Sequence, residues 1–224
     1  MLLSITNKED FDISMINTNI KIDLKEALNK PIVRIEIGCG PKRKDDMIGI
    51  DRVDMPSVDV VTDLESGLQF LPDNSVDEVH SSSCFEHIHN FENLMKEIVR
   101  VLKPSGKAYI FVPHFSNPHF YSDPTHVRFF GLYTFYYFVP PEYKLKMKRK
   151  VPGFYFDTKI NIISQRLVFD STFLLSKIIC RLFGNIFNLS TYIQEFYEAH
   201  LCYLFPCFGI NIIFSPVKET VQKQ

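Results

Sequence analysis

The feature that most constrains this chain is an apolar segment that ends in a glycine-rich turn. Residues 32–37 read I-V-R-I-E-I, and this richness in β-branched residues is typical of a buried strand. Gly38 and Gly40 follow directly, and glycine permits a positive φ and a close approach of a ligand to the backbone. In an open parallel sheet, ligands bind beyond the carboxyl ends of the strands. The segment therefore predicts a parallel sheet with a ligand-binding loop after one of its strands.

Further apolar segments alternate with loops and with one amphipathic helix. Strands are expected at residues 47–50, 58–61, 76–80 and 108–112, and helices at 23–29 and 91–102. Farther along the chain, a strand is expected at 159–169, helices at 171–186 and 191–204, and a closing strand at 210–214. Strands that alternate with helices or loops predict a sheet of the α/β class.

The composition fits one globular domain and excludes several classes of protein. The 224 residues carry a net charge of −1, which argues against a nucleic-acid partner, because such binding needs a basic surface. The five cysteines form no C-x-x-C pair and no secretory signal begins the sequence, so we expect a cytoplasmic location. The longest apolar run, residues 173–187, is interrupted by Lys177 and Arg181 and cannot span a membrane.

A second candidate ligand residue is Asp51, which ends the next expected strand. A carboxylate in that place can accept hydrogen bonds from both hydroxyls of a ribose. The glycine loop lacks a third glycine, and only ten residues separate Gly40 from Asp51. This is too short for a crossover helix whose N-terminus would receive a pyrophosphate. A nucleoside ligand without phosphates fits better than a dinucleotide, and S-adenosylmethionine is one such ligand.

Short motifs accompany the glycine loop in a characteristic order. They are Glu36 to Pro41 (E-I-G-C-G-P), Val60 to Leu64 (V-V-T-D-L), Leu71 to Val79 (L-P-D-N-S-V-D-E-V), Ser82 to Ile88 (S-S-C-F-E-H-I) and Leu102 to Gly106 (L-K-P-S-G). In order and spacing, the run from Arg34 to about Phe115 resembles the class I S-adenosylmethionine-dependent methyltransferases. It is most similar to the short-loop group of these enzymes that is found in surface-polysaccharide clusters.

The resemblance implies both a fold and a cofactor site. The implied fold is an α/β, Rossmann-like, seven-stranded and mostly parallel sheet with an antiparallel last strand and a helical C-terminal elaboration. The implied cofactor is S-adenosylmethionine. Its binding residues would be Glu36, Gly38 and Gly40 along the methionine and ribose, Asp51 at the ribose hydroxyls, Asp63 and Leu64 at the adenine, and Ser82 and Ser83 near the methionine end. Asp63 and the two serines could instead cap local turns or helices.

The acceptor side is expected just after the strand at 108–112, where histidines are concentrated. Transfer of a methyl group to a hydroxyl requires removal of a proton, and histidine is the natural base near neutral pH. The element D-P-T-H-V-R at residues 123–128 also resembles a recurring part of this methyltransferase group. The candidates are His126 as base with His114 second, Asp123 to orient an imidazole, and His119, Tyr121 and Arg128 to bind the acceptor. These residues could equally stabilise a loop.

No metal ligand set is predicted from the sequence. His114, His119, His126 and Asp123 could bind a divalent ion, but the histidine spacings of five and seven match no i, i+4 pair on a helix. Residues 86–87, a Glu-His pair, could reach the pocket or could brace the helix that follows.

The whole chain, residues 1–224, is expected to form a single methyltransferase domain with a basic arm and helical cap inserted at 144–205. Lysines in residues 144–150 mostly alternate with apolar residues, which predicts an exposed strand or hairpin arm. The apolar residues of 173–187 would pack on the sheet or on a second subunit, as in a homodimer. With Lys177 and Arg181 they could instead form a lid over a hydrophobic or lipid-linked acceptor at an anionic membrane surface.

The patterns favour an enzyme that methylates a hydroxyl of a sugar, of a polysaccharide precursor or of a small phosphorylated building block. The transfer would be in line, with a histidine as base. Two alternatives stay open. One is a methyltransferase for a quinone, a lipid or another small aromatic acceptor, which the 21 phenylalanines and 10 tyrosines would suit. The other is a non-catalytic partner subunit that only binds S-adenosylmethionine.

Overall fold

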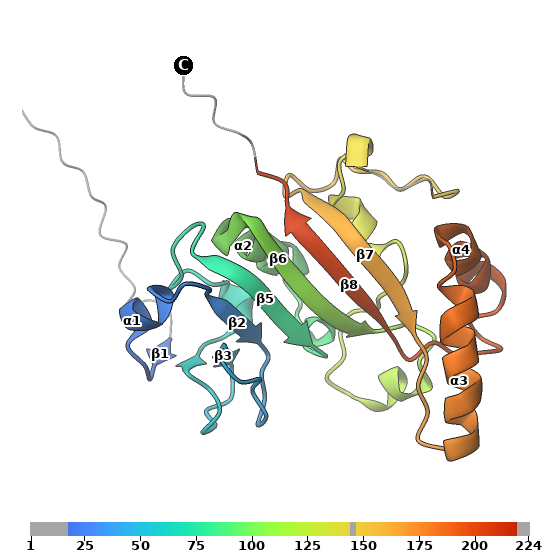
Figure 1. The fold of residues 1–224 in the computed structure, drawn as a ribbon, viewed down its shortest axis with the longest axis horizontal. Helices are drawn as coiled ribbons and strands as arrows, with labels where there is room; N and C mark the ends of the chain where they lie inside the picture. The colour runs from blue at the N-terminus through green and yellow to red at the C-terminus, as the bar shows by residue number, and fades with distance from the viewer. Residues whose placement is uncertain (1–17, 144–146, 219–224) are drawn as a thin grey trace, which may run out of the picture.

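A computed structural model describes residues 18–143 and 147–218, which are built around an eight-stranded sheet (Figure 1). The strands are β1 (Asn19–Ile20), β2 (Arg34–Ile37), β3 (Ile48–Asp51), β4 (Val60–Val61), β5 (Val76–Ser82), β6 (Leu102–Pro113), β7 (Ile160–Val168) and β8 (Gly209–Pro216). The α-helices are α1 (Leu24–Leu28), α2 (Phe91–Val101), α3 (Leu174–Phe187) and α4 (Thr191–His200). Short 3-10 helices include η2 (Leu64–Ser66), η3 (Phe85–His87), η4 (Pro118–Ser122), η5 (Thr134–Phe138) and η6 (Pro141–Tyr143).

The strands follow the order β1-β4-β3-β2-β5-β6-β8-β7 across the sheet. Strands β4, β3, β2, β5 and β6 are mutually parallel, whereas β8 runs antiparallel to both β6 and β7. The predicted Rossmann-like sheet with an antiparallel last strand is therefore confirmed. The eighth strand is β1, which pairs antiparallel with β4 at the edge and lies in a segment where the sequence has no clear periodicity.

The main core lies between the sheet and the layer that contains α2. Helix α2 begins at its N-cap Asn90, whose side chain accepts a hydrogen bond from the backbone N–H of Asn93. Its apolar face is completely buried, as an amphipathic helix on a sheet requires. Aromatic residues 130–138 pack on the same side, where Phe135 contacts Phe91 of α2 and Phe214 of β8. Much of the high aromatic content therefore belongs to this core.

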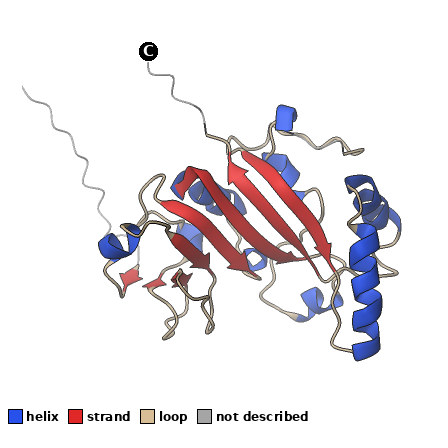
Figure 2. Ribbon diagram, in the orientation of Figure 1, coloured by secondary structure: helices blue, strands red, loops and turns tan. Residues whose placement is uncertain are grey.

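The opposite face of strands β5, β6, β8 and β7 is more open. Figure 2 shows no helix in front of these strands among the described residues. Tyr109, Phe111 and Ile213 on this face are only partly buried, whereas their neighbours Ile110 and Ile212 on the other face are inaccessible. In the described part of the chain, the sheet is therefore covered mainly on one side.

Helices α3 and α4 lie beside the β7 edge of the sheet (Figure 1). Helix α3 is anchored by Phe183 and Phe187, which contact Phe169 at the end of β7, and by the contact of Phe187 with Tyr197 of α4. The rest of its apolar stripe does not pack on the sheet; Leu175, for example, is 79% exposed. No helix of the described chain is long and apolar enough to cross a membrane, and its five cysteines are free thiols.

The prediction of an exposed strand or hairpin arm at residues 144–150 is wrong where it can be compared with the structure. Residues 144–146 lie outside the described residues, and residues 147–150 form no strand. The backbone N–H groups of Lys148 and Arg149 donate to the Glu195 carboxylate at 2.9 and 3.1 Å. A contact with α4 therefore fixes this segment as a loop, and no local pattern in the sequence signals that contact.

Candidate active site

A hollow lies at the carboxyl ends of the parallel strands. The strand order reverses between β2 and β5, because β3 and β4 extend the sheet on one side and β6 on the other. Such a switch point is where open α/β sheets bind ligands. A cavity of about 700 Å³ opens there, which is within the usual range for small-molecule sites. The loops after β2, β3, β4 and β5, together with residues 124–127, form its walls.

The two glycines after β2 have different structural reasons to be glycine. Gly38 and Gly40 have φ angles of 67° and 56°, a region that favours glycine. A Cβ added to Gly38 would lie 2.5 Å from the Cβ of Cys84, so this position needs glycine for packing. A Cβ added to Gly40 would meet nothing within 4 Å. Gly40 therefore leaves its backbone open toward the cavity, where a ligand can approach it.

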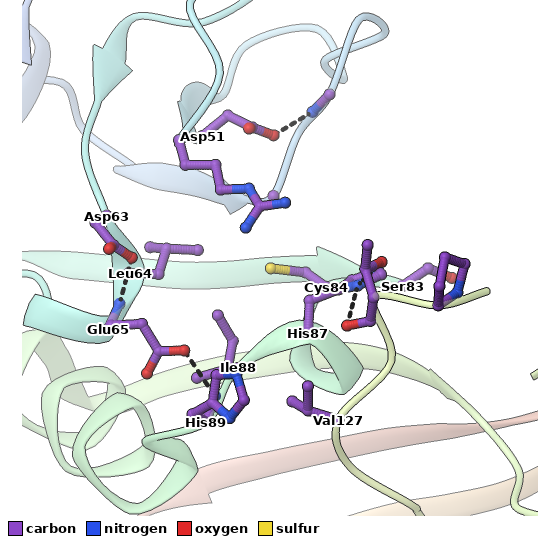
Figure 3. Close-up of a pocket in the computed structure, with 15 residues that line it drawn as sticks. Asp51, Asp63, Leu64, Glu65, Ser83, Cys84, His87, Ile88, His89 and Val127 are labelled. Atoms are coloured by element: carbon purple, nitrogen blue, oxygen red, sulfur yellow. Dashed lines mark hydrogen bonds between the residues drawn. The ribbon is translucent and has the colours of Figure 1, made fainter.

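Asp51 ends β3 at the cavity wall and is fixed by the backbone around it. Its Oδ2 accepts from the N–H of Gly40 at 2.9 Å, and its Oδ1 accepts from the N–H of Val53 at 2.9 Å. In Figure 3 the carboxylate lies on the opposite side of the cavity from His87 and Val127. A carboxylate has about four lone-pair positions, so two remain for hydroxyl donors. The position and the free acceptor capacity suit a ribose.

Asp63 lies at the cavity and also caps a local helix. Its Oδ1 accepts from the backbone N–H of Glu65 at 3.0 Å, which caps η2, and the next residue, Leu64, is buried at the wall. The two interpretations of Asp63 are therefore compatible. Ser83 lines the cavity with a φ of 53°. Ser82 instead lines a separate hollow on the open face of the sheet.

Glu36 stabilises the loop that contains Gly38 and Gly40. It is almost fully buried, and its Oε2 accepts from the backbone N–H of Lys44 at 2.7 Å. Glu36 is not among the described residues that line the cavity. In the structure its visible role is to fix the loop between β2 and β3.

The segment 123–127 brings part of the predicted acceptor group to the cavity. Thr125 and Val127 line it, and His126 between them lies just behind, with its ring 4.8 Å from that of His87. The Nδ1 of His126 bonds to the Phe120 carbonyl at 2.8 Å. The Oδ1 of Asp123 accepts from the hydroxyl and the N–H of Thr125, and these bonds lower the pKa of Asp123 below its ordinary value. The Asp123 Oδ2 lies 3.7 Å from the Nε2 of His126.

The second predicted base, His114, is placed elsewhere. Its side chain is inaccessible to solvent and bonds to the Ser116 hydroxyl at 2.8 Å and to the Glu198 carboxylate at 3.1 Å. Glu198 also accepts from the backbone N–H of Leu132. The geometry of His114 is thus that of a buried link between β6, the aromatic segment and α4.

The three predicted acceptor-binding residues also lie outside the cavity lining that the structure describes. His119 is exposed, and the hydroxyl of Tyr121, a residue 63% exposed, donates to a backbone carbonyl at 2.7 Å. The Arg128 guanidinium donates to the His89 carbonyl at 2.7 Å and lies 5.1 Å from the centre of the Phe91 ring. Their assignment to the acceptor stays a prediction.

The sequence analysis left open whether residues 86–87, which lie on η3, reach the pocket, and it gave no role to the cavity residues Arg52, Glu65 and Cys84. This short helix directs His87 into the cavity and Glu86 into the protein (Figure 3 labels His87). Glu86 is 1% exposed, and its Oε2 has no hydrogen-bond partner among the described residues. Burial raises the pKa of Glu86 to about 7. The Ser82-to-Ile88 motif was the available signal, but it does not reveal which side chains face the cavity.

Residues 40–110 match the methyltransferase domain family Methyltransf_11, and this match covers less than half of the chain. This part of the chain is therefore similar to a methyltransferase domain. S-adenosylmethionine, the cofactor expected from the sequence, supplies a methyl group on a positively charged sulfur. The open backbone at Gly40 and the oriented carboxylate of Asp51 fit this cofactor, because it has a ribose and no phosphates. Of the residues predicted to bind the cofactor, Gly38, Gly40, Asp51, Asp63, Leu64 and Ser83 line the cavity.

Solved structures similar to this methyltransferase domain are distant in sequence. A S-adenosylmethionine-dependent methyltransferase from Archaeoglobus fulgidus is 20% identical over 85% of this chain and 89% of that chain, with a TM-score of 0.44. The YcgJ protein of Bacillus subtilis is 14% identical over 88% and 97%, with a TM-score of 0.47. Phosphoethanolamine N-methyltransferase 2 of Haemonchus contortus, in complex with phosphomonomethylethanolamine and S-adenosylhomocysteine, is 18% identical over 88% and 52%, with a TM-score of 0.45. No curated protein matches the sequence.

Proposed function

We propose that this methyltransferase transfers the methyl group to a hydroxyl of a sugar, of a polysaccharide precursor or of a small phosphorylated building block. The cofactor lies along the β2 to β4 side of the cavity, and the acceptor lies on the side of η3 and residues 123–127. In-line displacement on an activated methyl group needs mainly positioning, together with removal of the hydroxyl proton. His126 is the base of this proposal, and Asp123 is the acidic group beside it.

The observation that carries the proposal is the orientation of His126. Because a carbonyl can only accept, the bond to Phe120 requires a proton on Nδ1 of His126, so Nε2 of the neutral ring carries the lone pair. The side chain is 12% exposed, and its neighbours Thr125 and Val127 both line the cavity. A small movement of residues 123–127 would therefore bring the unprotonated Nε2 of His126 to a hydroxyl in the cavity.

The character of the cavity wall favours a polar acceptor over a quinone or another aromatic one. None of the described residues that line the cavity is Phe, Tyr or Trp, whereas His87, His89 and Thr125 supply polar groups. The aromatic residues 130–138 are engaged in the core instead. A role as a non-catalytic partner subunit is disfavoured, because the cavity has both a prepared cofactor side and a histidine-rich opposite side.

The exposed face of α3 supports a further part of the proposal, contact with a membrane surface. Its apolar side chains lie beside the exposed cations Lys177 and Arg181, and the helix has no acidic residue. That combination suits an anionic lipid surface and thus a lipid-linked glycan precursor. A second copy of the chain is the alternative occupant. Five free cysteines suit the cytoplasmic location expected from the sequence.

The variant His126→Gln tests the base. Turnover, measured as release of S-adenosylhomocysteine with a panel of sugar, sugar-phosphate and lipid-linked acceptors, is expected to fall by roughly 10²-fold or more. Affinity for S-adenosylmethionine, measured by calorimetry, should be unchanged, because the ring lies outside the cofactor side. His200→Gln, an exposed histidine on α4, is the matched control.

Full turnover of His126→Gln would remove the residue as base. Absence of S-adenosylmethionine binding by the unsubstituted protein would overturn the proposed function as a whole. Methylation of a quinone with no activity on any hydroxylated glycan precursor would favour the aromatic alternative.

A further inference from the structure

Three side chains converge beside the acceptor end of the cavity. Glu86 and His87 come from η3, and His126 comes from the loop after η4. One potential ligand atom from each lies within 4.8 Å of the other two, and this is the group of metal-binding side chains found within the described residues. The histidines considered in the sequence analysis do not converge in this way, because His114 is bonded to Glu198 and His119 is exposed.

The protonation of His87 follows from its hydrogen bonds. The Thr125 hydroxyl has one proton, and it donates that proton to the Asp123 carboxylate at 2.6 Å, because a carboxylate can only accept. The same oxygen lies 2.9 Å from Nδ1 of His87 and must therefore accept there. Nδ1 of His87 carries the proton, and Nε2 of the neutral ring is left with its lone pair.

The same reasoning gives His126 a lone pair on Nε2, because its Nδ1 donates to the Phe120 carbonyl. The third member, Glu86, has a side-chain oxygen with no partner among the described residues, although the residue is 1% exposed. Three side chains that can each donate an electron pair thus lie close together. An unsatisfied buried carboxylate is costly, so the arrangement calls for a positive partner.

We infer that Glu86, His87 and His126 bind one divalent first-row transition cation of the zinc type. Two neutral imidazoles and one carboxylate form a ligand set that suits such cations better than magnesium or calcium, which prefer oxygen. Each histidine donates its other N–H to an oxygen atom, the arrangement that orients metal-ligating histidines in proteins. Ligand atoms around zinc lie about 3.4 Å apart at bond lengths of about 2.1 Å, so atoms 4.8 Å apart would have to approach by about 1.4 Å.

The inferred site would lie at the wall of the cavity. His87 lines the cavity wall, so an open coordination position can face it, and Asp123 lies close enough to His126 to serve as a further oxygen ligand. The existence of the site does not depend on the proposed function, but its part in methyl transfer does. A bound cation uses the same Nε2 lone pair of His126 that a base would use. His126 would therefore be the base only in the protein without the cation; with the cation bound, the cation would instead lower the pKa of a hydroxyl beside it.

The test is a zinc titration without cofactor or acceptor, so that its outcome is independent of methyl transfer. The full chain is stripped with a chelator, and ZnCl₂, MnCl₂ and MgCl₂ are titrated separately in a calorimeter. We expect one zinc ion per chain and much weaker binding of magnesium. Glu86→Gln and His126→Gln should each weaken zinc binding at least tenfold, whereas His200→Gln should leave it unchanged.

A cobalt titration distinguishes this site from the free cysteines. The visible absorption spectrum of the Co²⁺ form should show no thiolate charge-transfer band. The Co²⁺ absorption itself should be lost in His126→Gln. Equal zinc affinity in the unsubstituted protein and both variants, or a thiolate band, would overturn the inference. If circular dichroism shows that one variant does not fold, the other variant decides. Zinc binding without methyl transfer would leave the site standing and overturn only the proposed function.

Discussion

The Asp51 carboxylate both shapes the glycine loop and presents acceptors to the cavity. It holds the backbone N–H groups of Gly40 and Val53, and its remaining lone pairs are available to a ribose. We therefore expect Asp51→Ala to weaken S-adenosylmethionine binding by about 1.5–3 kcal/mol, the value of a hydrogen bond to a charged group, or roughly 10- to 150-fold in Kd. Calorimetry with S-adenosylmethionine and S-adenosylhomocysteine measures this change.

The control for this prediction is a carboxylate on the same loop. Asp54 is well exposed and pairs with Lys21 at 2.8 Å, so Asp54→Ala should leave cofactor affinity unchanged. Thermal unfolding without ligand separates loss of contacts to the cofactor from loss of the folded loop. An Asp51→Ala protein with undiminished affinity would remove this residue from the cofactor site.

The sequence predicts residue roles that depend on neighbouring residues of the chain. It does not predict roles that depend on contacts between distant segments. The need for glycine at positions 38 and 40 and the place of Asp51 follow from a strand, a turn and the next strand. The lone pair on His87 depends instead on Thr125, 38 residues away, and ultimately on Asp123. No pattern in one sequence reports such a chain of hydrogen bonds, so only the cofactor half of the site could be predicted in detail.

At the scale of elements, helices and strands with strong apolar periodicity were placed within a few residues. Helix α2 was expected at 91–102 and is found at Phe91–Val101, because Leu102 already begins β6. Strand β1 was missed because its two residues are exposed and lie in a segment without clear periodicity. The segment at 147–150 was assigned wrongly because the Glu195 carboxylate, which is distant in sequence, fixes its backbone.

Helix α3 carries a prediction about association. Its exposed face includes Leu175, Ile179 and Leu182, which are 79%, 51% and 56% exposed, and the cations Lys177 and Arg181. We expect the protein to sediment with vesicles of mixed phosphatidylcholine and phosphatidylserine, and to do so less at high salt, because both apolar burial and charge contribute. The double variant Leu175→Glu/Ile179→Glu should abolish this sedimentation.

Val53→Glu is the matched control, because it adds a charge at an exposed apolar residue far along the chain from α3. Circular dichroism verifies that each variant is folded. No vesicle binding, combined with a concentration-dependent mass in analytical ultracentrifugation that the double variant abolishes, would assign this face to a second copy of the chain instead.

At the scale of the whole molecule, the mostly parallel sheet was predicted from the sequence but its uneven covering was not. Alternating strands and helices favour a parallel sheet, and the reversal of strand order then places a cavity at the carboxyl ends. The loop after β6 folds over one face and brings His126 beside η3, while Tyr109 and Phe111 on the other face stay partly exposed. These long-range placements decide the acceptor end, and they depend on packing between segments that are distant in sequence.

One partly buried ion pair connects segments across the molecule. The Glu97 carboxylate of α2 accepts from Arg100 at 2.8 Å and from the backbone N–H of Leu68 at 3.0 Å, and Arg100 also donates to the carbonyls of Leu68 and Leu71. Lys218, which follows β8, donates to the Arg100 carbonyl at 3.0 Å. The network thus ties α2 to the segment before β5 and to the end of the last strand.

This network predicts how stability depends on acidity. Burial raises the pKa of Glu97, and the nearby charge of Asp73 acts in the same direction. The hydrogen bonds from Arg100 and Leu68 outweigh both effects and lower the pKa of Glu97 below its ordinary value of 4.5. A lowered carboxyl pKa contributes stability that is complete above the ordinary pKa and is lost as the pH falls through the lowered pKa.

Glu97→Gln should therefore reduce the free energy of unfolding by about 2–3 kcal/mol at pH 7. Between pH 5 and pH 3, the free energy of unfolding of this variant should fall by less than that of the unsubstituted protein. Urea unfolding followed by circular dichroism at pH 7, 5 and 3 measures both effects, and Glu26→Gln, an exposed carboxylate on α1, should resemble the unsubstituted protein. Equal acid sensitivity in all three proteins would show that the carboxylate of Glu97 does not link folding to pH, since its protonation is the only step that the substitution removes.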